Sequence, residues 1–414
     1  MKKETKKAPT IRFQGFTDDW EQRKLGDVCN QLTGAINPQT RPNELFVEYS
    51  MPAYDSGMKP NIVYGFTMNS TRKIVNESCL LINKLNVRKK RIWYIKNPTK
   101  NAVCSAEFIP LYSDNIDLLF LNYVVSRDSF TNYLEACSSG SSNSQKRVTP
   151  DIIIEAKVFL PVKDEQLKIG SYFQKIDNLI TLHQRKLDQL KTLKKYFLQN
   201  MFPAKGEKVP RIRFKGFTGD WEQRKFGEIA EYKKGPFGSA LKKEFFIPDS
   251  DISIKVYEQQ NAINKDWTLS RYYISQEYAQ KLKAFEVHSG DIIVSCAGTI
   301  GEIYELPAQA RPGIINQALM RIRVNKDIVC KDIFKLAFSN MIDSLSREFS
   351  NGSAIKNIPP FADLKPMKVL LPDKTEQKLI GDFFTDIDKT ITLHQRKLNQ
   401  LKMMKKFMLQ NLFI

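Results

Sequence analysis

One long stretch of this chain occurs twice, and this duplication constrains the fold more than any other feature. Residues 160–202 read LPVKDEQLKIGSYFQKIDNLITLHQRKLDQLKTLKKYFLQNMF, and residues 371–413 read LPDKTEQKLIGDFFTDIDKTITLHQRKLNQLKMMKKFMLQNLF. Each position of the second copy lies 211 residues after its counterpart in the first. Such a repeat indicates two copies of one structural unit.

In both copies, seam residues recur at alternating spacings of three and four, which is the pattern of a coiled coil. The first seam consists of Phe173, Ile176, Ile180, His183, Leu187, Leu190, Lys194, Phe197 and Met201, and the second of Phe384, Ile387, Ile391, His394, Leu398, Leu401, Lys405, Met408 and Leu412. Each helix needs an apolar partner, and the nearest one is the other copy. We therefore predict two long helices, within residues 159–203 and 370–414, that pair inside one chain.

The connection between the repeats sets the orientation of the helices. Residues 203–210 (PAKGEKVP) are too few to run back along the first helix, so the next domain begins where that helix ends. This predicts an antiparallel pair with a globular domain at each end. From Phe173 to Met201 the helix would rise about 42 Å at about 1.5 Å per residue, slightly more than one turn of B-DNA at about 34 Å. The pair has the length of a ruler for DNA, although an ordinary dimerisation coiled coil shows the same heptads.

A second duplication opens each half of the chain. Residues 9–28 (PTIRFQGFTDDWEQRKLGDV) match residues 210–229 (PRIRFKGFTGDWEQRKFGEI), 201 positions later. Because this spacing is shorter than that of the helices, the segments between them differ by ten residues while both borders are kept. We interpret this as one frame that carries two different inserts. Phe13, Phe16 and Trp20 are predicted to pack the frame against the helices.

Charge and cysteine usage restrict the class of partner and the compartment. The chain has 414 residues and a formal net charge of +19, which favours a polyanion such as nucleic acid, with an acidic protein surface as the alternative. Its six cysteines form no C-x-x-C pair, which indicates reduced thiols in the cytoplasm. No run of 18 apolar residues occurs, so neither export nor membrane insertion is expected.

The first insert is predicted to be a compact α+β domain, with strands in residues 72–85 and 91–96 and a helix over 116–136. Residues 84–100 contain seven cations and no acid, with Trp93 and Tyr94 interleaved. The cations that we predict to hold DNA phosphates are Lys84, Arg88, Lys89, Lys90 and Arg91. The alternative is a solvated strand edge guarded by lysines.

Further candidate DNA contacts lie in polar loops of both inserts. In the first insert they are Ser144, Gln145, Lys146 and Arg147, and in the second they are Gln259, Gln260, Asn261, Thr299, Ser353, Lys356 and Asn357. Short amides such as those of Gln259, Gln260 and Asn261 suit the edge of adenine, but a structural role fits them equally. Gly298 and Gly301 are expected to form a tight hairpin.

Three resemblances to catalytic or metal sites do not hold. Residues 357–361 (NIPPF) approach the N-P-P-F loop of amino-methyltransferases, but Ile358 separates the amide from the prolines. Residues 150–157 (PDIIIEAK) resemble a nuclease centre, yet on one strand Asp151 and Glu155 would lie about 13 Å apart, too far to share one Mg²⁺. His183 and His394 are expected to set helix register, with no metal bound. No phosphate-binding G-x-x-x-x-G-K-[ST] loop occurs.

Two unlike basic inserts, each framed by W-E-Q-R-K-x-G and by L-P-x-K-x-E-Q...L-H-Q-R-K-L...L-Q-N, resemble the specificity (S) subunit of type I restriction-modification systems. The residues GDIIVSCAGTIG of the second insert look like a target-domain hairpin of that family, whereas the first insert departs from it with NESCLLINKL. The resemblance implies two pseudo-symmetric α+β target recognition domains separated by an antiparallel pair of long coiled-coil helices. The corresponding domain borders are 1–158, 159–203, 204–369 and 370–414.

The same resemblance implies a subunit without catalysis of its own. Each domain would read one half of a split, asymmetric sequence in double-stranded DNA, and the helices would set the spacer. Two modification subunits would bring S-adenosylmethionine, and two restriction subunits would bring ATP and Mg²⁺, so that this chain binds no cofactor. The competing interpretations are a coiled-coil adaptor for an acidic protein and a fused methyltransferase or nuclease. An adaptor would bind without regard to DNA sequence, and an enzyme would need an intact catalytic motif.

Overall fold

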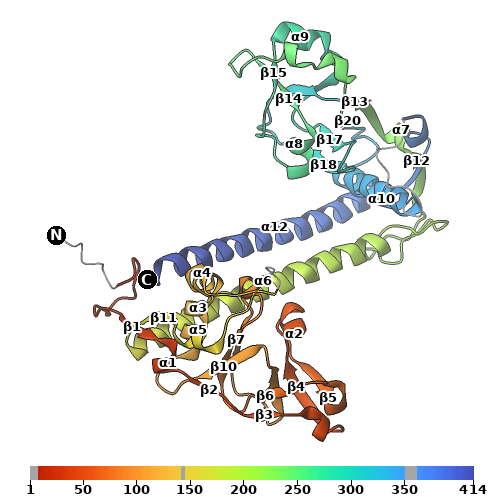
Figure 1. Cartoon of the computed structure of the whole chain (residues 1–414). Helices are drawn as coiled ribbons and strands as arrows, with labels where there is room; N and C mark the ends of the chain where they lie inside the picture. The colour runs from red at the N-terminus through yellow and green to blue at the C-terminus, as the bar shows by residue number, and fades with distance from the viewer. Residues whose placement is uncertain (1–7, 141–144, 350–360) are drawn as a thin grey trace. The chain divides into compact units, whose positions relative to one another are not determined.

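The computed structural model describes residues 8–140, 145–349 and 361–414, and the chain divides into two compact units (Figure 1). The first unit comprises residues 1–186 and 394–414, and the second comprises residues 187–393. Two helices of 38 residues each, α6 (Lys163–Asn200) and α12 (Lys374–Asn411), contribute to both units. The two long helices predicted from the repeats are therefore confirmed.

Three sheets build the described part of the first unit. The frame strand β1 (Glu21–Lys24) pairs antiparallel with β11 (Lys157–Leu160). A four-stranded sheet has the order β2 (Asn30–Gln31), β10 (Phe108–Tyr112), β7 (Cys79–Asn83), β8 (Ile92–Ile95). A five-stranded sheet has the order β3 (Ala35–Ile36), β6 (Arg72–Ile74), β9 (Ala102–Ser105), β4 (Leu45–Tyr49), β5 (Asn61–Tyr64), with β4 and β9 parallel. The helices are α1 (Leu25–Val28), α2 (Met51–Asp55), α3 (Leu118–Val125), α4 (Asp128–Ala136) and α5 (Pro150–Ile154).

The second unit repeats this plan. Its frame strand β12 (Glu222–Lys225) pairs with β21 (Lys368–Leu371). One sheet has the order β13 (Ala230–Lys234), β20 (Leu319–Val324), β17 (Ile292–Ser295), β18 (Ile303–Glu305), and the other β15 (Tyr273–Ile274), β14 (Ile254–Tyr257), β19 (Gly313–Ile315), β16 (Glu286–Val287). The helices are α7 (Phe226–Ile229), α8 (Gln259–Asn264), α9 (Gln276–Lys281), α10 (Lys331–Phe349) and α11 (Phe361–Leu364). Both inserts are thus α+β domains, as predicted.

The two duplicated frame segments are anchored in the same way. Trp20 and Trp221 are 1% and 2% exposed, which confirms a packing role for Trp20. Arg12 Nε and Nη2 each donate to the buried carboxylate of Glu165 at 2.8 Å, and Arg213 forms the same bidentate pair with Glu376 at 2.7 Å. This hydrogen bonding raises the pKa of both arginines. Each pair ties a frame segment to the first turn of a long helix.

Within each unit, the helix segments run antiparallel. In the first unit, the ring centroids of Phe173 and Phe413 lie 5.7 Å apart, and His183 Nδ1 lies 2.9 Å from His394 Nδ1, so residue numbers rise on α6 as they fall on α12. In the second unit, Lys194 pairs with Asp388 at 2.6 Å and the rings of Phe197 and Phe383 lie 4.9 Å apart, which again gives opposite directions. Burial of the seam residues Phe173, Leu187, Phe384 and Leu398 confirms the predicted seam, and the histidines face each other at equivalent positions.

Two elements differ from the expectation. The helix predicted over residues 116–136 is broken, because α3 ends at Val125 and α4 begins at Asp128 after the non-helical ψ of Arg127. The segment PDIII, for which we considered strand geometry when weighing the nuclease resemblance, forms helix α5 with Pro150 in its first turn. Proline fits that position because its missing N–H would have no helical partner there. The periodicity of this short apolar run could not distinguish strand from helix.

Candidate nucleic-acid interface

In the first unit, the turn between β7 and β8 lies directly beside residues 145–148. The backbone N–H of Asn86 donates to Lys146 O at 2.8 Å, and that of Val148 donates to Lys84 O at 3.1 Å. Leu85 and Arg147 also form an isolated β-bridge. We refer to residues 84–91 and 145–148 together as the first loop edge. It unites two predicted clusters that are far apart in the sequence.

Several cations of the first loop edge are already paired inside the protein. Arg88 Nε donates to Glu135 at 2.6 Å, Lys90 pairs with Asp128, and Arg147 pairs with Glu107 at 2.9 Å. Among the cations of the first loop edge, Lys84, Lys89 and Lys146 form no ion pair with any described residue. Gln145 is exposed beside them. These four side chains of the first loop edge are available to contact a polyanion.

Arg91 and Trp93 are placed differently from the prediction. Arg91 is 9% exposed, and its guanidinium donates to both carboxylate oxygens of Asp55 on α2 at 2.8 and 2.7 Å. Trp93 is 5% exposed and packs edge-on against Tyr49, with centroids 4.9 Å apart. β8 is covered on both faces, because Ile92 packs in one apolar cluster and Trp93 in another, so its basic and aromatic sequence is not a surface strand. The interpretation of these two residues as a DNA grip is therefore wrong.

In the second unit, three loops and the start of a helix meet at one end of the sheet β13-β20-β17-β18. The N–H of Gly235 donates to Leu319 O at 2.9 Å, and that of Cys296 donates to Ala318 O at 2.8 Å. The N–H of Asn316 donates to Tyr257 O at 3.0 Å, which brings the first turn of α8 to the same place. We refer to residues 235–238, 259–260, 296–302 and 316–318 as the second loop edge.

The second loop edge brings together three of the predicted candidates, Gln259, Gln260 and Thr299. Thr299 is exposed between Gly298 and Gly301, whose φ values are +66° and +81°. The predicted hairpin of β17 and β18 is confirmed, but residues 296–302 separate the strands, so the turn is not tight. Gln260 is exposed, and its side-chain oxygen accepts from Asn264 Nδ2 at 3.0 Å. The side-chain oxygen of Gln259 is buried and has no hydrogen-bond partner among the described residues. A buried acceptor of this kind is costly unless water or a ligand pairs with it.

Asn261 does not belong to this set. It is 2% exposed, and its side-chain amide donates to the carbonyls of Asp266 and Leu269 at 2.9 and 2.7 Å. Its side-chain oxygen accepts from the N–H of Glu258 at 2.8 Å. All of its capacity therefore holds the start of α8 and the following loop, which is the structural role that the sequence left open. The remaining candidates, Ser144, Ser353, Lys356 and Asn357, lie outside the described residues.

The structure adds two residues that the sequence did not single out. Phe237 is 88% exposed at the tip of the loop GPFG, and Gln317 is exposed beside Gly238. A Cβ at Gly235 would meet the carbonyl oxygen of Asn316 at 1.8 Å, so only glycine allows the two loops to pack. The glycines on both sides of Phe237 were the available signal in the sequence.

The two loop edges occupy the same topological position. The strand order β2-β10-β7-β8 corresponds to β13-β20-β17-β18, so the β7–β8 turn of the first unit is equivalent to the β17–β18 turn of the second. The type I restriction modification DNA specificity domain matches residues 17–192 and 218–403, which is one match for each half of the chain. The chain belongs to this family. It is a specificity subunit that recognises a DNA target.

Relatives of this specificity subunit match over nearly their whole length. The type I restriction enzyme MjaVIII specificity subunit of Methanocaldococcus jannaschii is 22% identical and covers 94% of this chain and 91% of its own. The putative MjaX specificity subunit of the same organism is 23% identical with the same coverage. The crystal structure of an S subunit from M. genitalium matches with a TM-score of 0.61 at 13% identity, over 98% of this chain and 99% of that chain. The likeness of this structure supports the fold.

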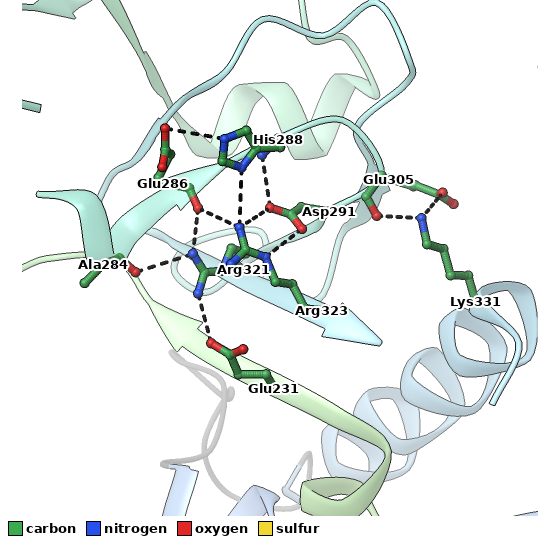
Figure 2. Close-up of polar contacts among 10 residues, drawn as sticks. Glu231, Ala284, Glu286, His288, Asp291, Glu305, Arg321, Arg323 and Lys331 are labelled. Carbon is green, nitrogen blue, oxygen red and sulfur yellow. Dashed lines mark hydrogen bonds and ion pairs between the residues drawn. The ribbon is translucent and has the colours of Figure 1, made fainter. Parts of the chain in front are cut away.

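Many charges of the specificity subunit stabilise its own second unit, as Figure 2 shows. Arg321 is 5% exposed and donates to Glu231 Oε1 at 3.0 Å and to the carbonyl of Glu286 at 2.6 Å. Arg323 binds both oxygens of Asp291 at 2.9 and 3.0 Å. Because these arginines are paired with groups of the protein itself, the net charge overstates the number of cations that are available to contact DNA.

A second ion-pair group in Figure 2 joins the sheet to α10. Burial by itself would raise the pKa of Glu305, but hydrogen bonds from Lys331 and Lys335, at 2.8 and 2.9 Å, more than offset this effect and lower it. The carboxylate is therefore held ionised between the two ammonium groups. This cluster fastens β18 to the helix that packs under the sheet, and we assign it a structural role.

The segment that resembles a nuclease centre is helical. Because Asp151 lies in the first turn of α5 and Glu155 at its C-terminal cap, the separation of about 13 Å calculated for one strand does not apply. Glu155 instead forms an ion pair with Lys24 at 2.6 Å. Across the described ranges, no group of three or more His, Cys, Asp or Glu side chains is arranged to hold a metal ion. In the same ranges, no helix is long and apolar enough to cross a membrane.

Proposed function

We propose that this specificity subunit is the non-catalytic DNA-reading component of a type I restriction-modification complex. Each unit reads one half of an asymmetric, bipartite target, and the helix pair sets the spacer between the halves. The observation that carries the proposal is that the two units share one topology while their loop edges carry different side chains. Different side chains in one frame are what two unlike half-sites require.

The proposal includes the partners and the compartment. Two modification subunits supply S-adenosylmethionine and the methyl transfer, and two restriction subunits supply ATP and Mg²⁺. The subunit acts in the cytoplasm as part of this complex. Its scattered free cysteines support a reducing compartment, and burial raises the pKa of Cys29 and Cys296 to about 12, so these thiols are unreactive.

An exchange of inserts tests the assignment of half-sites. Residues 29–158 are replaced by the corresponding insert of another family member, and the methylated motif of the host is sequenced. We expect one half of the motif to change, while the other half and the spacer are retained. A change in both halves would contradict one unit per half-site, and binding without sequence preference would favour the adaptor for an acidic protein.

A change in helix length tests the ruler. Seven residues are added to α6 and, at the equivalent positions, to α12, so that the seam keeps its register. We expect the same two half-sites with a longer spacer. As the control, the same insertion in α6 alone should misalign the seam and abolish assembly. If the variant with both insertions were active and its spacer were unchanged, the helix pair would not set the spacer.

A further inference from the structure

A cavity of about 530 Å³ opens in the first unit between α4, α6 and α12. It lies within the size range of about 300–1,000 Å³ that is typical of small-molecule sites. The charged residues that line it are Lys90, Arg127, Asp128, Asp177, Lys402, Lys405 and Lys406. Five cations face two carboxylates, which leaves a surplus of three positive charges. Lys90 also belongs to the first loop edge, whereas the amides that we assign to base reading do not line the cavity.

The two carboxylates are already bound to two of the cations. Lys405 Nζ lies 2.5 Å from Asp177 Oδ1, and Lys90 pairs with Asp128. In the described ranges, no Asp or Glu carboxylate lies within ion-pair distance of Arg127, Lys402 or Lys406. Three cations of the cavity therefore lack an acidic side chain as an ion-pair partner. Like charges held together in this way are unfavourable unless an anion joins them.

Arg127 is the most constrained of the three. Its side chain is partly buried, one Nη donates to the main-chain oxygen of Ile414, the last residue of the sequence, at 2.5 Å, and its guanidinium lies 5.4 Å from the centre of the Phe413 ring. These contacts fix the position of the guanidinium. Burial lowers the pKa of Arg127. An anion in the cavity would pair with Lys402 and Lys406, which form no ion pair in the described ranges.

The second unit contains the repeated lysines but not the arginine. Lys191, Lys194 and Lys195 are the counterparts of Lys402, Lys405 and Lys406, and Lys194 pairs with Asp388 at 2.6 Å as Lys405 pairs with Asp177. The equivalent Gln166 and Gln377 accept from the N–H groups of Asp117 and Cys330 at 2.9 and 2.8 Å. Counted from these two residues, Arg127 corresponds to Asn340. The second copy thus provides a matched control.

We propose that this cavity of the first unit binds a phosphate group. Lysines supply point charges, the guanidinium supplies paired N–H donors, and the exposed Ser129 adds a hydroxyl, which together suit a doubly charged, oxygen-rich anion. The phosphate comes either from the DNA backbone or from a phosphorylated small molecule. The proposal rests on the geometry of the cavity and does not depend on how the inserts read bases.

The first experiment measures the binding of pyrophosphate to the full chain by calorimetry. Lys402→Ala combined with Lys406→Ala should weaken binding about tenfold or more, equal to about 1.4 kcal/mol, while Lys191→Ala with Lys195→Ala should leave it unchanged. All four positions are exposed on helices, so thermal melting should confirm that both variants fold. Absence of pyrophosphate binding, or equal loss in both variants, would overturn the proposal.

The second experiment distinguishes the two sources of phosphate. The same variants, assembled with the modification subunits, are titrated with a duplex that lacks the target and, separately, with ATP. If the backbone is the ligand, the slope of log K against log salt for the duplex falls by about 2 in the Lys402/Lys406 variant only. If a small molecule is the ligand, only ATP binding falls. Loss of neither overturns the proposal, and discrimination between cognate and mismatched duplexes, measured in parallel, reports separately on base reading.

Discussion

The two units are built on one backbone plan, yet they differ where the plan is open to solvent. In both, a strand that ends in tyrosine runs parallel to an inner strand, with Tyr49 opposite Cys104 and Tyr257 opposite Ile315. The residues that follow, Ser50 and Glu258, have the same φ of −116° and ψ of 165° as they begin α2 and α8. The equivalence therefore extends to individual backbone torsions.

The loop edges differ in chemistry. The β7–β8 turn of the first unit carries Arg88, Lys89 and Lys90, whereas the equivalent turn of the second unit carries Gly298, Thr299 and Gly301. A cationic turn suits phosphates, and a small turn with a hydroxyl allows close approach to a base edge. This difference shows that packing keeps the same backbone in both units. The exposed loops are not constrained by packing, so the two units can carry different side chains there and recognise different bases.

Arg12→Met and Arg213→Met should give the largest effect, and the same effect in each unit. Each change leaves a fully buried carboxylate, Glu165 or Glu376, without its partner. We expect each variant to lose about 3–5 kcal/mol of unfolding free energy. Arg23→Met, at an exposed pair with Glu21, serves as the control and should cost less than about 1 kcal/mol. Chemical denaturation measures all three variants. A small loss of unfolding free energy at only one of the two frame arginines would contradict the equivalence of the two units.

The next largest effect is expected at a core position where the two units differ, Lys255 in the second unit and Val47 in the first. Lys255 is 3% exposed at the position that Val47 occupies in the first unit, and burial lowers the pKa of its amine from 10.5 to about 8. Between pH 8 and 10.5, the unfolded chain holds a proton that the folded chain has released, so stability rises with pH. Lys255→Val should remove this rise, which amounts to at most about 3 kcal/mol.

Thermal melts of wild type and Lys255→Val from pH 7 to 10.5 measure this prediction. The variant should be the more stable protein at pH 7, and the two curves should converge as the pH rises. Lys242→Val, at an exposed lysine of the same unit, should show the pH dependence of the wild type. Parallel curves for wild type and Lys255→Val would mean that Lys255 stays protonated in the fold.

The sequence predicted what repetition and periodicity determine. The helices, their pairing and the packing of Trp20 follow from apolar residues at fixed spacings, and two copies of each pattern leave little freedom. The status of individual charges could not be predicted in this way. Whether Arg91 meets Asp55 or solvent depends on contacts between residues far apart in the chain, and composition treats every cation alike.

The roles of the interface residues also depend on contacts between residues that are far apart in the chain. Gln259, Gln260 and Thr299 come together because β14 and β17, from two different sheets, both end beside residues 316–318, which the local sequence does not reveal. Asn261 has the same chemistry as its neighbours, but in the first turn of α8 its side chain turns inward. Phe237 and Gln317 gain significance only once the loops that carry them are seen to touch.

Single amides should sharpen the comparison of the two loop edges. Gln145→Ala removes an exposed amide from the first, and Gln317→Ala removes one from the second. If each amide reads a base edge, discrimination should fall by about 1–3 kcal/mol at one base pair, in opposite halves of the target. Binding of the assembled subunits to single-mismatch duplexes measures it. Effects in the same half would contradict one unit per half-site.

The smallest effect should come from the free lysines of the first loop edge. Lys89→Ala combined with Lys146→Ala removes two cations that lack an ion pair, and each phosphate contact contributes about 0.9 to the slope of log K against log salt. The slope for all duplexes should shrink by about 2, with base discrimination unchanged. Lys96→Ala with Lys100→Ala removes two exposed cations after β8, away from that turn, and is the matched control. A salt series on cognate and unrelated duplexes measures both variants. Since the pairs carry equal charge, an equal change in slope would show that only the general field of this basic protein matters, and that the first loop edge is a solvated edge guarded by lysines.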